Sequence, residues 1–268
     1  MQIKVLYEDE YVLALDKPSG LLVHGDGRTK EETLVDWLNK NYPDLKEVGE
    51  EQILQSGEKI KRPGIVHRLD KETSGVILVA KTQEAFLFFK NQFKNHSVEK
   101  VYNAVVWGMF KEKEGIINKP IGRSASDFRK WSAEHGAKGE LREAVTEYKV
   151  LVQSSKDGHL QNAPVPEGAH QGALGFSYLE VKPKTGRTHQ IRVHLKSISH
   201  PVVGDKLYGH NAPALRVDPS YNKRGKNSEP ISRLALHAVS IKLELPNHTH
   251  ITIESPLPPE FENAKNMA

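Results

Sequence analysis

The segment 63–81 constrains the fold most, because it joins a polar turn to an uninterrupted apolar strand. Ile65 and Val66 lead into the turn, and Val76–Ala80 leave it without a charged residue. The turn is rich in chargeable and hydroxyl side chains: His67, Arg68, Asp70, Lys71, Glu72, Thr73 and Ser74. A turn needs only Gly, Asn, Asp or Ser to reverse the chain, and polar groups held at a strand edge often carry chemistry. Spacing alone leaves two interpretations open, a plain capped turn and a catalytic loop.

Short strand-like segments dominate the rest of the chain. They lie at 3–7, 11–16, 21–24, 102–107, 145–152, 178–182, 187–195, 237–245 and 249–253. Helices are expected at 33–39, with Thr33 as N-cap, and at 83–94, where three Phe residues form a core stripe. Residues 44–62 are expected to form a loop. Many strands and few helices predict an α+β protein with a mixed, largely antiparallel central β-sheet and flanking helices.

Residues 187–195 alternate between two kinds of side chain. If they form a strand, Arg187 shares a face with Ile191 and Val193. An unpaired charge on an apolar face is costly, so we expect Arg187 to have an acidic partner.

Composition sets broad limits on the class of protein. A chain of 268 residues can bury a proper core, and we expect a single domain over 1–268. The segments 111–140 and 154–175 have little apolar pattern and are expected to be partly mobile insertions. No apolar run reaches membrane-helix length, the start carries acids where a signal peptide is apolar, and Cys is absent. These features predict a cytoplasmic protein.

The charge balance is mildly basic. Lys and Arg number 38 against 34 Asp and Glu, which gives a net charge of +4. This balance is compatible with a polyanionic partner but is common among soluble proteins. Basic residues cluster at 59–62, 123–130 and 182–187, and each cluster could equally be a solvated face.

The sequence predicts no metal and no nucleotide cofactor. His189 and His194 would lie on opposite faces of a strand, and His248 and His250 have only Glu254 as a nearby carboxylate. No His-Glu-x-x-His arrangement, phosphate loop or dinucleotide fingerprint occurs.

Four ordered motifs resemble the RluA-type pseudouridine synthases, over nearly the whole chain. They are His67-Arg-Leu-Asp70 with Thr73-Ser-Gly75, Lys100-Val-Tyr102, Gly186-Arg-Thr-His-Gln-Ile-Arg-Val-His194, and His200-Pro-Val-Val-Gly-Asp205. His67 and Ser74 favour this branch over the RsuA-type enzymes. The resemblance implies the pseudouridine synthase fold with a catalytic cleft.

The resemblance also implies roles for individual residues. Asp70 would be the nucleophile, Tyr102 would pack against the target base, and Arg187 would pair with Asp70. Arg68 would insert into the RNA stack where the target base is flipped out. Further RNA contacts are expected from His67, Lys17, Arg129 and Lys130. Each position also has a plain alternative, such as a half-buried strand Tyr, a surface ion pair or an ordinary turn Lys.

The expected function is cofactor-free isomerisation of uridine in a structured rRNA or tRNA by a monomer. A strand of the catalytic type begins at residue 3, so we expect no N-terminal RNA-binding module and target choice through the insertions. Asp70 could attack the ribose, attack the uracil ring or help form a glycal. One alternative is an Asp-based hydrolase of N-glycosidic bonds, with Glu72 or Asp205 as second carboxylate. The other is a catalytically silent RNA-binding protein.

Overall fold

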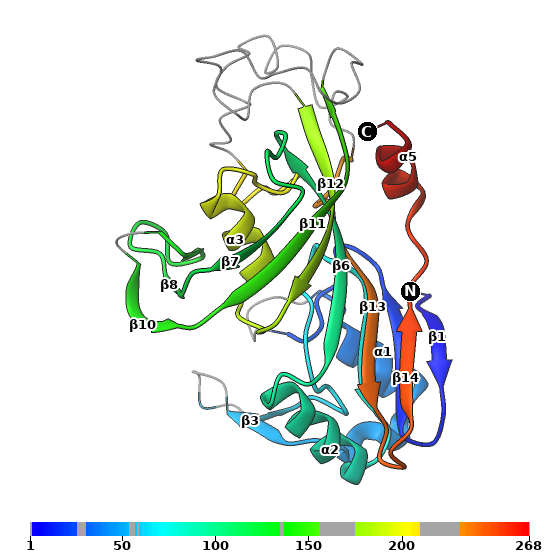
Figure 1. Ribbon diagram of the computed structural model, residues 1–268. Coiled ribbons are helices and arrows are strands. Elements are labelled where there is room, and N and C mark those ends of the chain that lie inside the picture. The colour runs from blue at the N-terminus through cyan, green and yellow to red at the C-terminus, as the bar shows by residue number, and fades with distance from the viewer. Residues whose placement is uncertain are drawn as a thin grey trace. The chain divides into compact units, whose positions relative to one another are not determined.

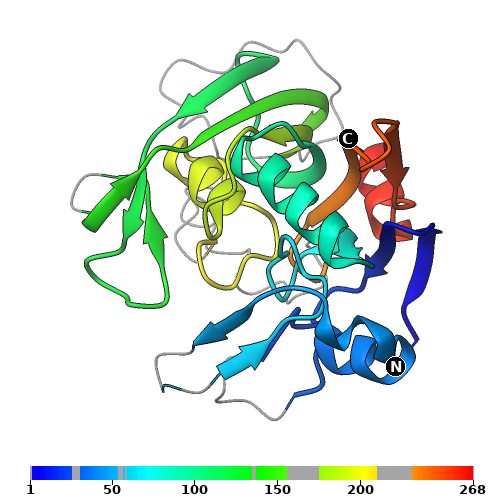
Figure 2. The ribbon, with the colours of Figure 1, turned by 90° about the horizontal axis from the view of Figure 1, so that it is seen from below.

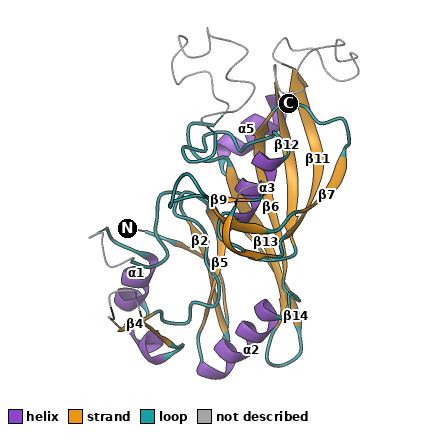
Figure 3. Ribbon diagram, turned by 90° about the vertical axis from the view of Figure 1, so that its left-hand side faces the viewer, coloured by secondary structure: helices purple, strands orange, loops and turns teal. Residues whose placement is uncertain are grey.

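The computed structural model describes residues 2–25, 31–53, 57, 59–134, 137–155, 175–209 and 231–267 (Figure 1). They form two compact units, Met1–Lys100 with Ala238–Pro256 and Val101–His237 with Leu257–Ala268. Each unit combines helices with strands that pair mostly antiparallel (Figure 3). The predicted α+β class is therefore confirmed, while the description of the chain as a single domain stays a prediction.

In the first unit the strands follow the order β1-β2-β5-β13, and β14 pairs with β13. Their bounds are β1 Lys4–Glu8, β2 Val12–Lys17, β5 Ser74–Ala80, β13 Leu236–Glu244, which begins in the second unit, and β14 His250–Glu254. Every residue of β5 is buried. This burial explains its unbroken apolar sequence, because a strand covered on both faces has no side to leave polar.

The first unit also holds two helices and a hairpin. Helix α1 (Leu34–Asn41) begins at Thr33, whose hydroxyl accepts a hydrogen bond from the Asp36 amide in a capping box, as predicted. Helix α2 (Gln83–Lys94) buries Phe86 and Phe89, which confirms their core assignment, whereas Phe93 is only half-buried. The stretch 44–62, expected to be a loop, instead contains the 3-10 helix η1 (Pro43–Glu47) and the strands β3 (Glu51–Ile53) and β4 (Lys59–Lys61) (Figure 2).

In the second unit the strand order is β6-β12-β11-β7, all antiparallel. The bounds are β6 Glu99–Trp107, which begins in the first unit, β7 Glu114–Asn118, β11 Val145–Ser155 and β12 Gly175–Pro183. Helices α3 (Gln190–Ser197) and α5 (Pro259–Met267) place Ile191, Leu195 and Phe261 in the core of this unit. Helix α5 was not predicted.

The expected insertion at 111–140 contains regular structure that the sequence analysis did not predict. A three-stranded sheet has the order β10-β8-β9, with β8 Ile121–Arg123, β9 Trp131–Ser132 and β10 Lys138–Arg142. Most of the other expected insertion, residues 156–174 of 154–175, lies outside the described residues. Among the described helices, none combines the length and hydropathy needed to cross a membrane.

The prediction of a strand at 187–195 is wrong, because helix α3 begins at Gln190. All residues from 190 to 195 are buried, including the polar Gln190, Arg192 and His194. The alternation of polar and apolar residues therefore does not separate a solvent-exposed face from a buried one. Gln190 and His194 both contact the hydroxyl of Thr146, as residues four apart on a helix can.

Candidate functional site

The loop that carries Asp70 is held rigidly at both ends. Leu69, Thr73 and Ser74 are buried, and the Thr73 amide donates to the Asp70 carbonyl at 3.1 Å. Before the loop, the Ala80 amide donates to the carbonyl of Gly64 at 2.8 Å. Gly64 has φ +62°, and a Cβ there would lie 2.3 Å from the Ala80 oxygen. Asp70 itself is half-buried, so its carboxylate stands on an immobilised backbone with access to a ligand.

The turn at 17–20 is hydrogen-bonded to the Asp70 loop. The Lys17 ammonium is fully buried and donates to the carbonyls of Pro18, Leu21 and Lys71 at 2.8–3.0 Å. The Gly20 amide also donates to the Lys71 carbonyl. This enclosure of the Lys17 ammonium supports a structural role, and a contact between Lys17 and RNA stays a prediction.

His67 anchors the start of the loop to β5. Its Nε2 accepts a hydrogen bond from the Leu78 amide at 2.9 Å, and its ring stacks on Phe93 with centroids 4.8 Å apart. Burial, and then the charge of Lys100, lower the pKa of His67 to about 3. The imidazole is therefore neutral, which matches its role as acceptor of an amide N–H. This geometry supports a positioning role, and an RNA contact by His67 stays a prediction.

Arg68 is exposed on the loop next to Asp70. Its Nη1 donates to Nε2 of His24 at 3.3 Å. Within the described part of the chain no carboxylate forms an ion pair with Arg68, which disfavours the surface ion pair considered as its alternative.

Tyr102 and Arg187 lie in the second unit. Tyr102 is half-buried on β6, opposite Val181. Arg187 precedes helix α3 and donates from Nε to the carbonyl of Glu143 at 2.9 Å. Arg187 does not lie on the apolar face of a strand, contrary to the prediction, because helix α3 begins three residues after it. Its pairing with Asp70, which belongs to the other unit, stays a prediction.

The side chain of Gln190 fixes the backbone around Arg187. Its Oε1 accepts from the Thr185 hydroxyl at 2.7 Å and from the Arg187 amide at 2.9 Å. Its Nε2 donates to the Val145 carbonyl and to the Thr146 hydroxyl, both at 3.0 Å. Every donor and acceptor of the buried Gln190 side chain is thus hydrogen-bonded, and these bonds join this loop to β11. The sequence analysis missed this role, although the polar residue within an apolar stretch was the signal.

The buried arginine of this motif is Arg192. It donates from Nε and Nη2 to Asp205 at 2.7 and 2.9 Å, and the side chains are 9% and 0% exposed. Burial alone would raise the pKa of Asp205, but the hydrogen bonds and charge of Arg192 and the amides of Tyr208 and Leu207 hold it below its ordinary value. Asp205 is therefore fully engaged. It is a poor candidate for the water-activating carboxylate of a hydrolase.

Arg129 and Lys130 lie in the loop between β8 and β9. Arg129 is exposed and binds Asp127 through both Nε and Nη2, at 3.0 and 2.8 Å. These hydrogen bonds, more than charge alone, lower the pKa of Asp127 to about 2. The loop contacts the motif after β12 through Tyr208, whose hydroxyl accepts from the Trp131 amide and bonds to Nδ1 of His189.

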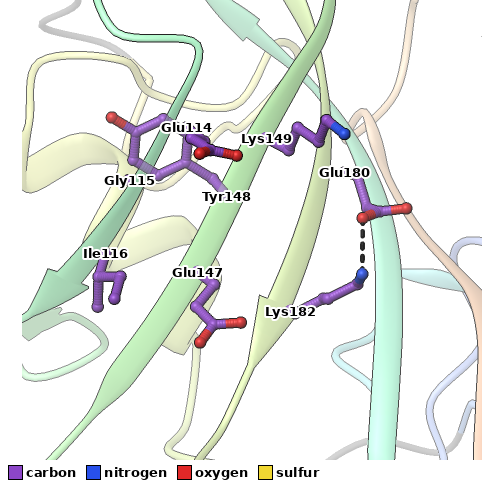
Figure 4. A pocket seen from close by; sticks show the side chains of 8 residues that line it. All are labelled: Glu114, Gly115, Ile116, Glu147, Tyr148, Lys149, Glu180 and Lys182. Carbon is purple, nitrogen blue, oxygen red and sulfur yellow. Dashed lines mark ion pairs between the residues drawn. The ribbon is translucent and has the colours of Figure 1, made fainter.

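A hollow on the second unit contains none of the predicted site residues. Figure 4 shows its lining on β7, β11 and β12: Glu114, Gly115, Ile116, Glu147, Tyr148, Lys149, Glu180 and Lys182. Carboxylates outnumber ammonium groups here, and Lys182 is paired with Glu180 at 2.8 Å. The hollow is therefore unsuited to a polyanion. In the described ranges, no three His, Asp or Glu residues gather as a metal site would require.

Comparisons with known proteins agree on one family. The sequence pattern of the family described as RNA pseudouridylate synthase matches residues 11–197. An uncharacterized RNA pseudouridine synthase of Synechocystis is 36% identical, over 97% of this chain and 67% of its own length. Ribosomal large subunit pseudouridine synthase D of Pseudomonas aeruginosa is 34% identical, over 97% of this chain and 70% of its own length.

The chain spans only part of these relatives, and 58% of an uncharacterized RNA pseudouridine synthase of Aquifex aeolicus. Among solved structures, human RNA Pseudouridylate Synthase Domain Containing 4 superimposes with a TM-score of 0.65 at 25% identity, covering 98% of this chain and 92% of that one. Human RNA Pseudouridylate Synthase Domain Containing 1 has a TM-score of 0.68 at 23% identity, with 96% and 84% covered. The latter likeness concerns the fold alone.

Proposed function

The chain belongs to the RNA pseudouridine synthase family, and we propose that it isomerises a uridine in a structured RNA with Asp70 as nucleophile. The observation that carries the proposal is the immobilised loop that presents the half-buried Asp70 beside the exposed Arg68. Relatives named for the ribosomal large subunit favour rRNA over tRNA as the substrate. We further propose that the protein acts as a monomer in the cytoplasm.

The reaction breaks the bond between ribose and N1 of uracil and joins the ribose to C5. A carboxylate nucleophile can divide such a substitution into two easier steps through a covalent intermediate. The anchored backbone supports this role, because a nucleophile held in place reacts with less loss of freedom. The isomerisation consumes no other reactant, so the proposal needs no cofactor.

The remaining predicted residues take supporting roles in the proposal. The exposed Arg68 would fill the gap in the base stack left when the uridine is flipped out, since a planar guanidinium stacks on bases. Tyr102 would pack against the flipped base, and Arg187 would pair with the Asp70 carboxylate. Arg129 and Lys130 would contact the RNA backbone.

The test is Asp70→Asn, with Glu72→Gln as a matched change of the neighbouring carboxylate. We expect Asp70→Asn to abolish pseudouridine formation in an rRNA transcript while RNA affinity and thermal stability change little. Glu72→Gln should retain activity. Pseudouridine is mapped by mass spectrometry, and free uracil is measured by chromatography.

Three outcomes would contradict the proposal. Activity retained in Asp70→Asn would exclude Asp70 as the nucleophile. Release of free uracil, lost in Glu72→Gln, would instead support the hydrolase. RNA binding by the wild type without any change to the RNA would support a silent binding protein.

A further inference from the structure

Arg62 has no part in the proposed chemistry and precedes the Asp70 loop in the chain. It is half-buried, and its Nε–H is shielded from water and has no hydrogen-bond acceptor among the described residues. A buried donor without an acceptor destabilises the folded protein, and more so when the group is charged. The position is therefore unfavourable in the free protein unless an anion joins it.

A second guanidinium makes the position of Arg62 more unfavourable. Burial lowers the pKa of Arg62, and the nearby charge of Arg68 lowers it further. In the described part of the chain neither arginine forms an ion pair with a carboxylate. Arg68 donates a hydrogen bond to the imidazole of His24, which carries no negative charge to offset the guanidinium. Two close cations without a counter-charge are typical of a site that binds an anion.

The backbone keeps Arg62 in this position. Pro63 and Gly64 follow it and are buried, and the Gly64 amide donates to the Val48 carbonyl at 2.9 Å. The Arg62 carbonyl accepts from the Ile65 amide at 3.1 Å. These hydrogen bonds hold the main chain of Arg62 in place, so its side chain starts from a fixed point.

We propose that Arg62 binds a phosphodiester of the RNA strand beside Arg68, next to the Asp70 loop. The proposal rests on the proposed function for the identity of the polyanion. A guanidinium offers planar, paired N–H donors that match phosphate oxygens, and the Nε–H of Arg62 supplies one of them. The phosphate satisfies this donor and neutralises the repulsion between the two arginines. It also holds the strand where Arg68 reaches the base stack.

The proposal predicts opposite effects on binding and on stability. Arg62→Gln removes one cation, and we expect RNA affinity to fall about tenfold or more, as for a charged hydrogen bond. The slope of log affinity against log salt should decrease in magnitude by about 0.7–0.9, as expected for one lost phosphate contact. Without RNA, the same variant should unfold at the same or a higher temperature than the wild type. A purely structural arginine would lower that temperature.

The matched control is Lys242→Gln in the same unit. Lys242 is 48% exposed and is paired with Glu99 at 3.2 Å, so its loss removes the same charge without touching the loop. We expect its salt slope to equal that of the wild type. Equal slopes in all three proteins would overturn the proposal, as would a lower unfolding temperature in Arg62→Gln.

A direct reading uses the Nε–H resonance of Arg62, identified by its absence in Arg62→Lys. Dimethyl phosphate, a phosphodiester probe, should shift this resonance, while chloride at equal ionic strength should not. A shift with inorganic phosphate alone would indicate a free-phosphate site and overturn the RNA assignment. The site and the enzymatic activity fail separately. An Arg62-dependent salt slope without pseudouridine formation rejects the activity, and pseudouridine formation with an unchanged slope rejects the site.

Discussion

The buried pair of Arg192 and Asp205 offers the most quantitative test of this fold. Replacing Arg192 with Met keeps an apolar stem of similar length but removes both hydrogen bonds to Asp205. Breaking a fully buried pair from one side costs on the order of 3–5 kcal/mol, because the remaining charge lies unpaired. The carboxylate of Asp205 is completely buried but keeps the hydrogen bonds from the Leu207 and Tyr208 amides, so we expect a loss within this range. A typical domain is stable by only about 5–15 kcal/mol, so the variant becomes marginal.

The same pair predicts how the loss depends on pH. In the wild type the pKa of Asp205 is depressed, so its contribution to stability is complete above the unfolded value of about 3.9 and is lost as the pH falls below it. In Arg192→Met, burial is no longer opposed by the guanidinium, and we expect the pKa of Asp205 to rise. The native variant then takes up a proton before the unfolded chain does. The difference in unfolding free energy between the wild type and Arg192→Met should therefore decrease as the pH falls from 7 to 5.

The assay is urea unfolding of the wild type, Arg192→Met, Asp205→Asn and the double variant, followed by tryptophan fluorescence. Trp107 and Trp131 lie in the same unit as the pair and report on its unfolding. The double variant should lose less stability than the sum of the single changes, because no lone charge remains.

The control is Arg142→Met, which breaks the exposed pair with Glu140. We expect it to cost less than about 1 kcal/mol. If the stability losses of Arg192→Met and Asp205→Asn simply add, the two residues are not coupled. A difference from the wild type that increases at lower pH would likewise contradict the predicted rise in the pKa of Asp205.

Two further predictions concern the support of the Asp70 loop. Lys17→Met should lower the unfolding temperature and leave the salt slope of RNA binding unchanged, because the Lys17 ammonium is hydrogen-bonded to buried carbonyls. An altered slope would support Lys17 as an RNA contact. Gly75→Ala should destabilise by several kcal/mol, since its Cβ would lie 2.2 Å from the Ala238 oxygen at φ +111°. Gly20→Ala, at φ +87° in open space, should cost only about 1 kcal/mol in denaturant unfolding, and equal losses would contradict the steric argument.

Prediction from the sequence succeeded where local signals and burial agreed. The Thr33 cap marks the start of α1, the aromatic stripe of α2 has a helical period, and β5 is an unbroken apolar run. Prediction failed at 187–195, where the buried polar residues of 190–195 alternate with apolar ones, as they would in a strand with one exposed face. These side chains are hydrogen-bonded inside the protein, which only the tertiary structure shows. Thr146 is the partner of both Gln190 and His194. Asp205 is the partner of Arg192.

The candidate site could be predicted only in part, for a related reason. Asp70 and Arg68 stood out because charged side chains are unnecessary in a plain turn. Lys17 was assigned to RNA from the family resemblance, and the sequence does not show the carbonyls that enclose its ammonium. Arg62 was missed as an individual residue, since its lack of an acceptor is a property of its surroundings.

The Asp70 loop is anchored through main-chain oxygens, and this has a consequence for how substrate preference can diverge. The carbonyls of Lys71 and Glu72 accept from Lys17, Gly20 and Ser19. A carbonyl is the same for every residue type, so mutations at 71 and 72 leave the anchor intact. These two positions form a natural site for a combinatorial library. New side chains can be sampled there, directly after the proposed nucleophile Asp70, without moving its backbone.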